Sequence, residues 1–427
     1  MKKKRRGGLS AGTIAMLVLT ACVLVAMAAF LFLIAGDGVY ERTRAAFGRF
    51  AETPSPTGIP SPEPTIEMTH TPMPMAAPTP TIEPTQAPEL ATVTLAAAGT
   101  VYAPKAIRES AQESGDHYNF ASIFDGIGDT LSAADLAIVT LETTTAGREK
   151  GYGNYNTSPQ ILDALRACGV DLVALATERA LDKGYDGLDL TLSELTSRAL
   201  AYAGVYPDSG NGSATMMNID GVQVAVLAYS YGLSDEGREQ TKNDGAGVLA
   251  LMDIQKMTQD ITRARVDGAN IVIVLPHWGT KNRAETPETV RAMAKILAQA
   301  GADVILGTHP NVVQGVERIH TVRSDGLTYE TVVCYSLGCL LTDARNSENT
   351  AGMAVNLTLV YDSNTRRAYP GEVKITPLYI ACQRKDGKNV YRVVDAEDEQ
   401  ALSKLTIAEQ QAAAQAVLRV RQAVKGE

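Results

Sequence analysis

The chain has 427 residues, 45% of them hydrophobic and 20% charged, so it is long enough to bury a sizeable core. Its formal net charge is −9 despite the basic start MKKKRR, and this acidic balance argues against a nucleic-acid partner. The five cysteines show neither CxxC spacing nor a Cys/His pattern, which argues against a cysteine-based metal site. Cys168 and Cys334 lie in apolar stretches and are expected in the core; the sequence selects no disulfide pairing.

The N-terminal segment has the pattern of a membrane anchor. Residues 1–12 begin with the basic cluster, and the apolar residues 13–35 would span roughly 30 to 35 Å as a helix, enough to cross a bilayer. The basic end is expected to stay cytoplasmic, which places the rest of the chain outside. A cleaved signal peptide would have a shorter apolar region, and LTAC at 19–22 leaves lipidation at Cys22 as an alternative. We expect an uncleaved, single-pass anchor in the cytoplasmic membrane.

Residues 36–90 are predicted to form an extended linker. From residue 52 onward Pro and Thr dominate, and few side chains could contribute to a core. Such a chain is partly polyproline II and acts as a semi-stiff spacer. We therefore expect a tether that holds the following domain away from the membrane.

Strand and helix patterns alternate from residue 91 onward. Strands are predicted at 92–99, 134–142, 169–175, 221–231, 269–279 and 302–310, and then at 328–338, 352–362 and 371–381. Helices are predicted at 120–134, 158–169, 188–201, 252–266, 286–300 and, in the tail 386–427, at 406–423. The pattern favours an α/β domain over 91–385, a layered αββα sandwich with helices outside and mixed sheets inside. The apolar runs IVIVL and DVIL indicate strands that are covered on both faces.

Three polar side chains follow buried strands of this pattern. His277 and His309 each come just after such a strand, and Glu142 ends a third. A single histidine there is more often a hydrogen-bonded structural residue, but two histidines and a glutamate together favour a metal site with nitrogen and oxygen ligands.

Seven motifs in order resemble those of one known family. They are LAAAGT (95–100), the aromatic residues at 118 and 120, ADLAIVTLE (134–142), LATERALDKG (175–184), HWG (277–279), GADVILGTHPN (301–311) and YSLGC (335–339). Over roughly residues 92–382 the chain is similar to the poly-γ-glutamate capsule biosynthesis (CapA) family, which is related to the calcineurin-like metallophosphoesterases. The resemblance implies a metallophosphatase-like fold and a role in capsule or cell-envelope polymer biosynthesis.

The chain departs from the family pattern at positions where metal ligands are expected. The replaced positions are Thr100, Thr140, Thr177, Glu178, Arg179, Asn311 and Cys339, whereas Glu142, Asp182, His277 and His309 are retained. The resemblance implies catalytic roles for His277, His309 and Asp182. It implies metal ligation by Glu142, His277 and His309, and ligand binding by Trp278 and Asn311. Glu178 could replace the family's asparagine as a ligand of a single metal, and Arg179 could bind an anionic ligand.

These replacements predict that the two-metal site is lost. Two adjacent dications need several anionic and imidazole ligands, which Thr100 and Arg179 do not supply. Arg179 could instead pair with Glu142, Glu178 or a bound anion, or could be a solvated loop residue. At most one divalent metal is expected. We expect a non-catalytic protein that binds an anionic envelope polymer or polymer-synthase subunits. An active hydrolase and a sensor whose C-terminal helix docks a partner are the alternatives.

Overall fold

The computed structural model describes residues 89–206, 214–242, 248–323, 325–346 and 348–425. The predicted anchor and linker therefore lie outside the described residues. Within the described ranges, no helix is both long and apolar enough to cross a membrane. The described residues all belong to one compact unit, Glu83–Glu427.

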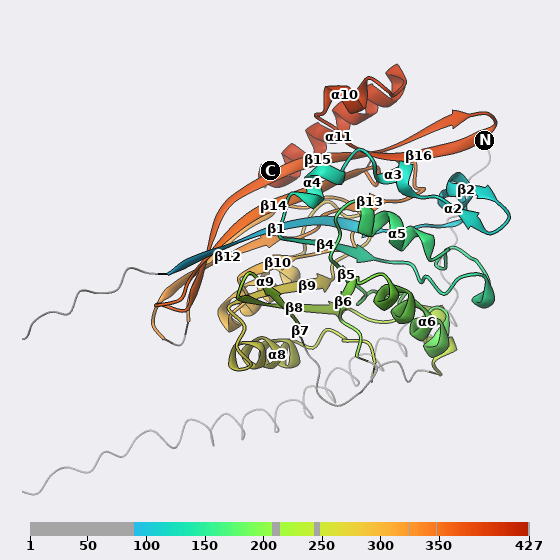
Figure 1. The fold of residues 1–427 in the computed structure, drawn as a ribbon. Coiled ribbons are helices and arrows are strands. Elements are labelled where there is room, and N and C mark those ends of the chain that lie inside the picture. The colour runs from blue at the N-terminus through green and yellow to red at the C-terminus, as the bar shows by residue number, and fades with distance from the viewer. Residues whose placement is uncertain (1–88, 207–213, 243–247, 324, 347, 426–427) are drawn as a thin grey trace, which may run out of the picture. The chain divides into compact units, whose positions relative to one another are not determined.

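The first sheet is mixed, with strand order β16-β15-β14-β1-β4-β5-β6, and β13 also pairs with β1 (Figure 1). β1, β4, β5 and β6 run parallel, and β14, β15 and β16 add an antiparallel half. Its strands are β1 (Leu90–Val101), β4 (Leu136–Leu141), β5 (Leu172–Ala174), β6 (Ala201–Ala203), β13 (Cys339–Leu341), β14 (Ala351–Asp362), β15 (Arg367–Lys385) and β16 (Lys388–Asp395).

The second sheet has the order β11-β12-β10-β9-β8-β7. β8, β9, β10 and β12 are parallel, with antiparallel β7 and β11 at the two edges. Its strands are β7 (Thr215–Ile219), β8 (Val222–Ser230), β9 (Ile271–His277), β10 (Val304–Leu306), β11 (Val316–Val322) and β12 (Thr328–Cys334). All seven residues of β9 are buried, as its uninterrupted apolar run predicts. A separate hairpin joins β2 (Gln112–Ser114) to β3 (His117–Tyr118).

Helices cover the sheets on their outer sides (Figure 1). α8 and α9 pack against the second sheet and share an apolar cluster that includes Met257 and Leu297. The Asp253 side chain accepts a hydrogen bond from the Lys256 backbone and so caps α8. The helices are α2 (Lys105–Ala111), α3 (Ala121–Phe124), α4 (Gly128–Ser132), α5 (Gln160–Ala167), α6 (Gly184–Ser197), α7 (Asp235–Gln240), α8 (Ile254–Val266), α9 (Glu288–Ala300), α10 (Glu399–Leu402) and α11 (Ile407–Lys425), with a 3-10 turn at η1 (Arg148–Lys150).

The α/β arrangement with two mixed sheets is confirmed, but one predicted helix is wrong. Residues 120–134 form two short helices, α3 and α4, because the chain between them lies against β16. A Cβ at Gly126 would meet the Val393 carbonyl oxygen at 2.6 Å, so the chain can approach β16 this closely only at a glycine. The predicted C-terminal helix is present as α11, which packs against β14 and β15 and buries Ala413, Ala416 and Val420.

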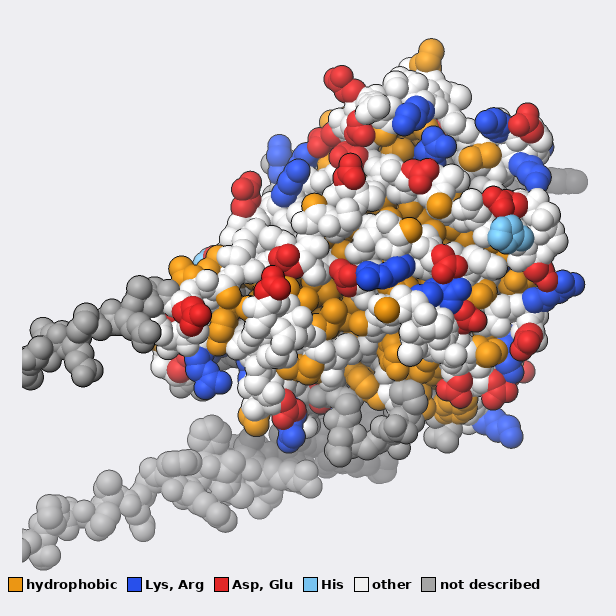
Figure 2. All heavy atoms as spheres, viewed as in Figure 1, with side chains coloured by type: hydrophobic (Ala, Val, Ile, Leu, Met, Phe, Trp, Pro, Cys, Tyr) orange, Lys and Arg blue, Asp and Glu red, His pale blue; other side chains and the backbone are white. Residues whose placement is uncertain are grey.

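The surface and the cysteines agree with the composition. On the face shown in Figure 2, acidic and basic side chains are interspersed, without a continuous basic surface. Cys168 and Cys334 are buried and unpaired, which confirms their placement in the core. Cys339 and Cys382 are also free.

Candidate functional site

The candidate site forms where strand ends of the two sheets meet. His277 is the last residue of β9, and His309 follows β10; both strands belong to the second sheet. Glu178 lies in the loop after β5, in the first sheet. In parallel α/β sheets the carboxyl ends of the strands are the usual place for a site.

Glu178, His277 and His309 form a buried cluster. One donor atom from each residue lies within 4.8 Å of the other two. The His277 Nε2 to Glu178 Oε2 distance is 2.6 Å, and the His309 Nδ1 to His277 Nε2 distance is 3.3 Å. The predicted ligands His277, His309 and Glu178 are therefore brought together by the fold.

The pKa shifts and the hydrogen bonds together indicate which ring nitrogen of His277 carries its proton. Burial lowers the pKa of His277, so its imidazole is neutral near pH 7. Burial opposes ionisation of Glu178, but hydrogen bonds with His277 and His309 hold its pKa well below the usual range. A neutral His277 then donates its Nε2–H to the Glu178 carboxylate and accepts from the Thr308 hydroxyl, 2.9 Å from Nδ1.

Strained backbone and an aromatic ring surround the second histidine. His309 has a φ of 95° and Asn311 a φ of 60°, conformations that residues with a Cβ rarely adopt. The Tyr231 ring lies 4.5 Å from the His309 ring and 6.3 Å from the His277 ring, centroid to centroid. Backbone strain of this kind concentrates at functional sites.

Glu142, at the end of β4, is buried and one of its carboxylate oxygens has no hydrogen-bond partner among the described residues. Burial and the negative charge of Glu178 raise its pKa to about 8, against the opposing charges of Lys281 and Arg179. Glu142 is therefore largely protonated at neutral pH, and it stands beside the cluster as a proton donor rather than as a fixed anion.

The residues present fit one divalent metal. Two imidazole nitrogens and one carboxylate oxygen are ligands that Zn²⁺ accepts, and a site with three protein ligands keeps a position open. Ligation through His277 Nε2 requires the ring proton on Nδ1, where Thr308 Oγ1 can accept it.

The same residues do not fit a second metal. Several replaced positions carry buried oxygens with no hydrogen-bond partner in the described part of the chain: Thr100 Oγ1, Thr177 Oγ1 and Asn311 Oδ1. These oxygens are neutral, and Arg179 adds a positive charge. Such a set lacks the anionic ligands that hold adjacent dications.

Arg179 is not the solvated loop residue of one prediction, nor does it form an ion pair with Glu142 or Glu178. Its guanidinium stacks over the Tyr155 ring at 3.8 Å and lies 3.3 Å from Asp182. Asp182 also accepts a hydrogen bond from the Ser234 hydroxyl, and burial raises its pKa. Asp182 thus anchors the loop outside the metal cluster, and its catalytic role stays a prediction.

Trp278 and Asn311 make structural contacts in the fold, and ligand binding by these two residues stays a prediction. Trp278 is 1% exposed, and its indole N–H donates to the Tyr335 carbonyl at 2.9 Å, so it packs in the core. The Asn311 backbone carbonyl accepts from Asn349 at 2.9 Å, which holds the strained loop after His309.

Sequence reasoning missed Thr308, Tyr231 and Lys281. Thr308 directly precedes His309, and Tyr231 directly follows strand β8. Their positions just after strand ends could have indicated that they belong to the site. Lys281 follows the HWG motif, and its charge opposes the protonation of Glu142.

Comparison with known proteins identifies the relatives of this chain. The PGA biosynthesis protein CapA of Bacillus subtilis (strain 168) is 28% identical over 230 residues, which cover 52% of this chain and 57% of the relative. The capsule biosynthesis protein CapA of Bacillus anthracis is 27% identical over 190 residues, 43% of each chain. A probable polyglutamine synthesis accessory protein of Mycobacterium tuberculosis is 28% identical over 198 residues, covering 43% of this chain and 52% of the relative. The chain spans about half the length of the curated relatives it matches.

Solved structures match this chain at low TM-score and low sequence identity. The NAD nucleotidase of Haemophilus influenzae has a TM-score of 0.43 and 12% identity, over 79% of this chain and 57% of the other. A calcineurin-like phosphoesterase from Bacillus subtilis has a TM-score of 0.39 and 12% identity, over 78% of this chain and 98% of the other.

The family assignment comes from the sequence. The model of the family "Bacterial capsule synthesis protein PGA_cap" matches residues 94–344, more than half of the chain, and this span contains Glu142, Glu178, His277 and His309. The expected resemblance to CapA proteins is confirmed. This chain belongs to the bacterial capsule synthesis protein PGA_cap family.

Proposed function

We propose that this protein acts in the biosynthesis of an anionic, poly-γ-glutamate-type envelope polymer, and that it binds a single divalent metal without two-metal catalysis. The observation that carries the proposal is the buried Glu178–His277–His309 cluster beside a protonated Glu142 and a cationic Arg179. Family membership and the names of the CapA relatives support the polymer class.

The location outside the membrane is part of the same proposal. The basic start and the apolar residues 13–35 support a single-pass anchor with a cytoplasmic N-terminus. The expected partners are the cytoplasmic membrane, the anionic polymer and polymer-synthase subunits. Deletion of residues 1–36 should move the protein from the membrane fraction to a soluble fraction, and membrane retention would contradict the anchor.

The residues of the site would divide their roles as follows. Glu178, His277 and His309 would hold the metal, and the Thr308 hydroxyl would orient the His277 ring. A bound divalent metal would supply Lewis acidity and a fixed positive charge. Arg179, held by Tyr155 and Asp182, would present its guanidinium to carboxylates of the polymer.

Metal stoichiometry tests the proposal directly. The full chain, loaded with Zn²⁺ or Mn²⁺ and desalted, should retain one metal per chain by plasma mass spectrometry and should not hydrolyse bis(p-nitrophenyl) phosphate. Retention of two metals together with turnover would contradict the proposal. Complete absence of bound metal would contradict its metal-binding part.

Replacement of Arg179 should weaken polymer binding. Arg179 lines a cavity of about 260 Å³ with Tyr155, Asp182 and Glu236, so its charge is accessible from solvent. In Arg179→Gln we expect the affinity for a fluorescent γ-linked glutamate oligomer to fall about tenfold, measured by anisotropy at low salt. Arg263→Gln, an exposed arginine of α8 that pairs with Asp267 and does not line this cavity, is the matched control. Equal losses in both variants would point to nonspecific attraction.

An active hydrolase is the second candidate function. The elevated pKa of Glu142, about 8, favours it, because a protonated carboxyl beside a metal cluster can act as a general acid. This candidate predicts metal-dependent release or transfer of poly-γ-glutamate that Glu142→Gln abolishes while the bound metal is retained.

A further inference from the structure

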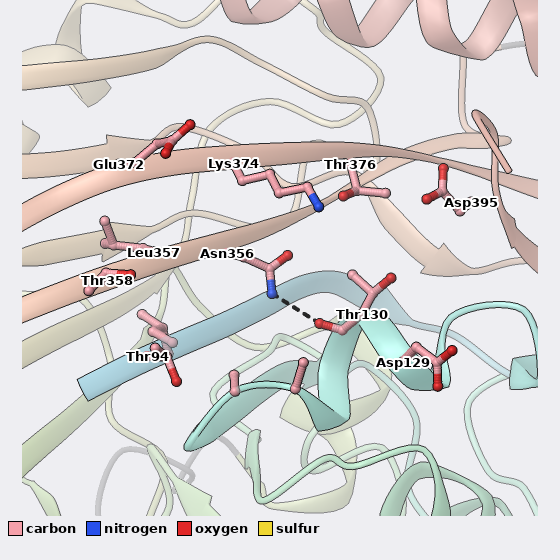
Figure 3. A pocket seen from close by; sticks show the side chains of 13 residues that line it. Thr94, Asp129, Thr130, Asn356, Leu357, Thr358, Glu372, Lys374, Thr376 and Asp395 are labelled. Atoms are coloured by element: carbon pink, nitrogen blue, oxygen red, sulfur yellow. Dashed lines mark hydrogen bonds between the residues drawn. The ribbon is translucent and has the colours of Figure 1, made fainter. Parts of the chain in front are cut away.

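A polar cleft of about 500 Å³ lies on the first sheet and shares no residue with the Glu178–His277–His309 cluster (Figure 3). Its floor consists of side chains from β1, β14 and β15. One wall comes from α4 and the residues that follow it, and Asp395 lies at the end of β16. The cleft is therefore built on paired strands of the sheet rather than on mobile loops.

The alternation along β15 produces the cleft surface. Glu372, Lys374 and Thr376 line the cleft, whereas Val373 and Ile375 between them pack against the main core. The strand register places Asn356 of β14 directly opposite Lys374. The Asn356 side-chain amide donates to the Thr130 carbonyl at 3.0 Å, which fixes the amide and leaves its oxygen free to accept.

The charged groups of the cleft are only partly paired with one another. Lys374 extends over the strand between Asn356 and Thr376, and its ammonium forms no ion pair with any described residue. The carboxylates of Asp129 and Glu372 also lack ion-pair partners among the described residues. Asp395 accepts a hydrogen bond from the Glu397 backbone at 2.9 Å, and the charge of Lys374 favours its ionised form. The cleft thus offers to a ligand one cation, the free carboxylates of Asp129 and Glu372, and the second oxygen of Asp395.

We propose that this cleft binds a short segment of a hydroxyl-rich glycan that carries one carboxylate. The three carboxylates and the Asn356 oxygen can accept hydrogen bonds from sugar hydroxyls, and Lys374 can pair with the single carboxylate. The methyl groups of Ala133, Ala134 and the floor threonines can contact the C–H face of a sugar ring.

The same charges disfavour a polyanion. Lys374 can pair with one carboxylate, but each further carboxylate of a chain such as poly-γ-glutamate would face Asp129, Glu372 or Asp395 without a second cation. The ligand expected in the cleft therefore differs in class from the anionic polymer that is proposed to bind Arg179. This inference does not rest on the metal cluster, and either can fail without the other.

Calorimetric titration of the full chain in detergent micelles tests the inference. The probes are the disaccharide of N-acetylglucosamine and N-acetylmuramic acid, which carries one carboxylate, and chitobiose, which carries none. We expect saturable binding of both, with the acidic disaccharide bound about tenfold more tightly. Lys374→Gln should abolish this preference, and Asp129→Ala should weaken both disaccharides.

Lys385→Gln is the matched control, because this exposed lysine lies on the same strand outside the cleft, and it should leave both affinities unchanged. All three variants should retain the metal content of the unsubstituted protein. Absence of saturable binding, an unchanged preference in Lys374→Gln, or tighter binding of a γ-linked glutamate oligomer in competition with the acidic disaccharide would each overturn the proposal.

Discussion

The Glu178→Gln variant should bind Zn²⁺ at least about 100-fold more weakly than the unsubstituted protein. Glu178 provides the single anionic atom of the three-ligand cluster, and its replacement leaves two imidazoles around the metal. Loss of a residue that merely orients a metal ligand costs about 10- to 100-fold in affinity, so loss of the ligand itself should reach at least the upper end. Competition with a chromogenic chelator would measure the change.

Thermal unfolding gives a second measure of the same loss. Zn²⁺ at about 100 times its Kd stabilises a folded protein by about 2.7 kcal/mol, and at the same zinc concentration this increment should fall to about 0.4 kcal/mol or less in Glu178→Gln. The glutamine oxygen can still accept the His277 hydrogen bond, so the metal-free variant should remain folded. Glu236→Gln, an exposed carboxylate of the neighbouring cavity, is the control. An unchanged zinc affinity in Glu178→Gln would show that the metal binds elsewhere.

The positions of the two histidines were predictable because each follows a buried strand. Parallel strands deliver the side chains at their carboxyl ends to one edge of a sheet, so His277 and His309 were expected to be neighbours. Glu178 was expected as a ligand only from its place in the family pattern, because β5 belongs to a different sheet and the strand-end argument does not link it to the histidines. The packing of the two sheets against one another decides the contact between Glu178 and the histidines, and the local sequence carries no signal for it.

The stacking of Arg179 on Tyr155 was likewise not predictable from the local sequence. The sequence places a cation in the loop after β5, but Tyr155 comes from an irregular segment whose path depends on tertiary contacts. The predicted helix at 120–134 failed for a related reason, since the close approach of Gly126 to β16 overrides local helix propensity. Long apolar strands such as β9 and amphipathic helices such as α9 were predicted well because their patterns follow directly from burial.

The Glu142→Gln variant should become more stable relative to the unsubstituted protein as the pH rises. Folding raises the pKa of Glu142 from its ordinary value of 4.5 to about 8, because the carboxyl is buried beside the anionic Glu178. Above pH 4.5 the unfolded chain ionises this group and the folded chain does not, so the unsubstituted protein loses stability until the pH passes about 8. Glutamine does not titrate, so the variant avoids this loss.

Chemical denaturation in the presence of a chelator, between pH 5 and pH 9, would measure the effect. The difference in the free energy of unfolding between Glu142→Gln and the unsubstituted protein should shift toward the variant by on the order of 3 kcal/mol over this range. Glu149→Gln, at an exposed position, should give no such trend. Because Glu178 is one cause of the raised pKa, the shift should shrink in a Glu178→Gln background, and the double-mutant cycle isolates this coupling. Parallel pH profiles for Glu142→Gln and the unsubstituted protein would show instead that Glu142 is ionised in the folded protein, and a fixed anion at that position would favour metal ligation by Glu142 over proton donation.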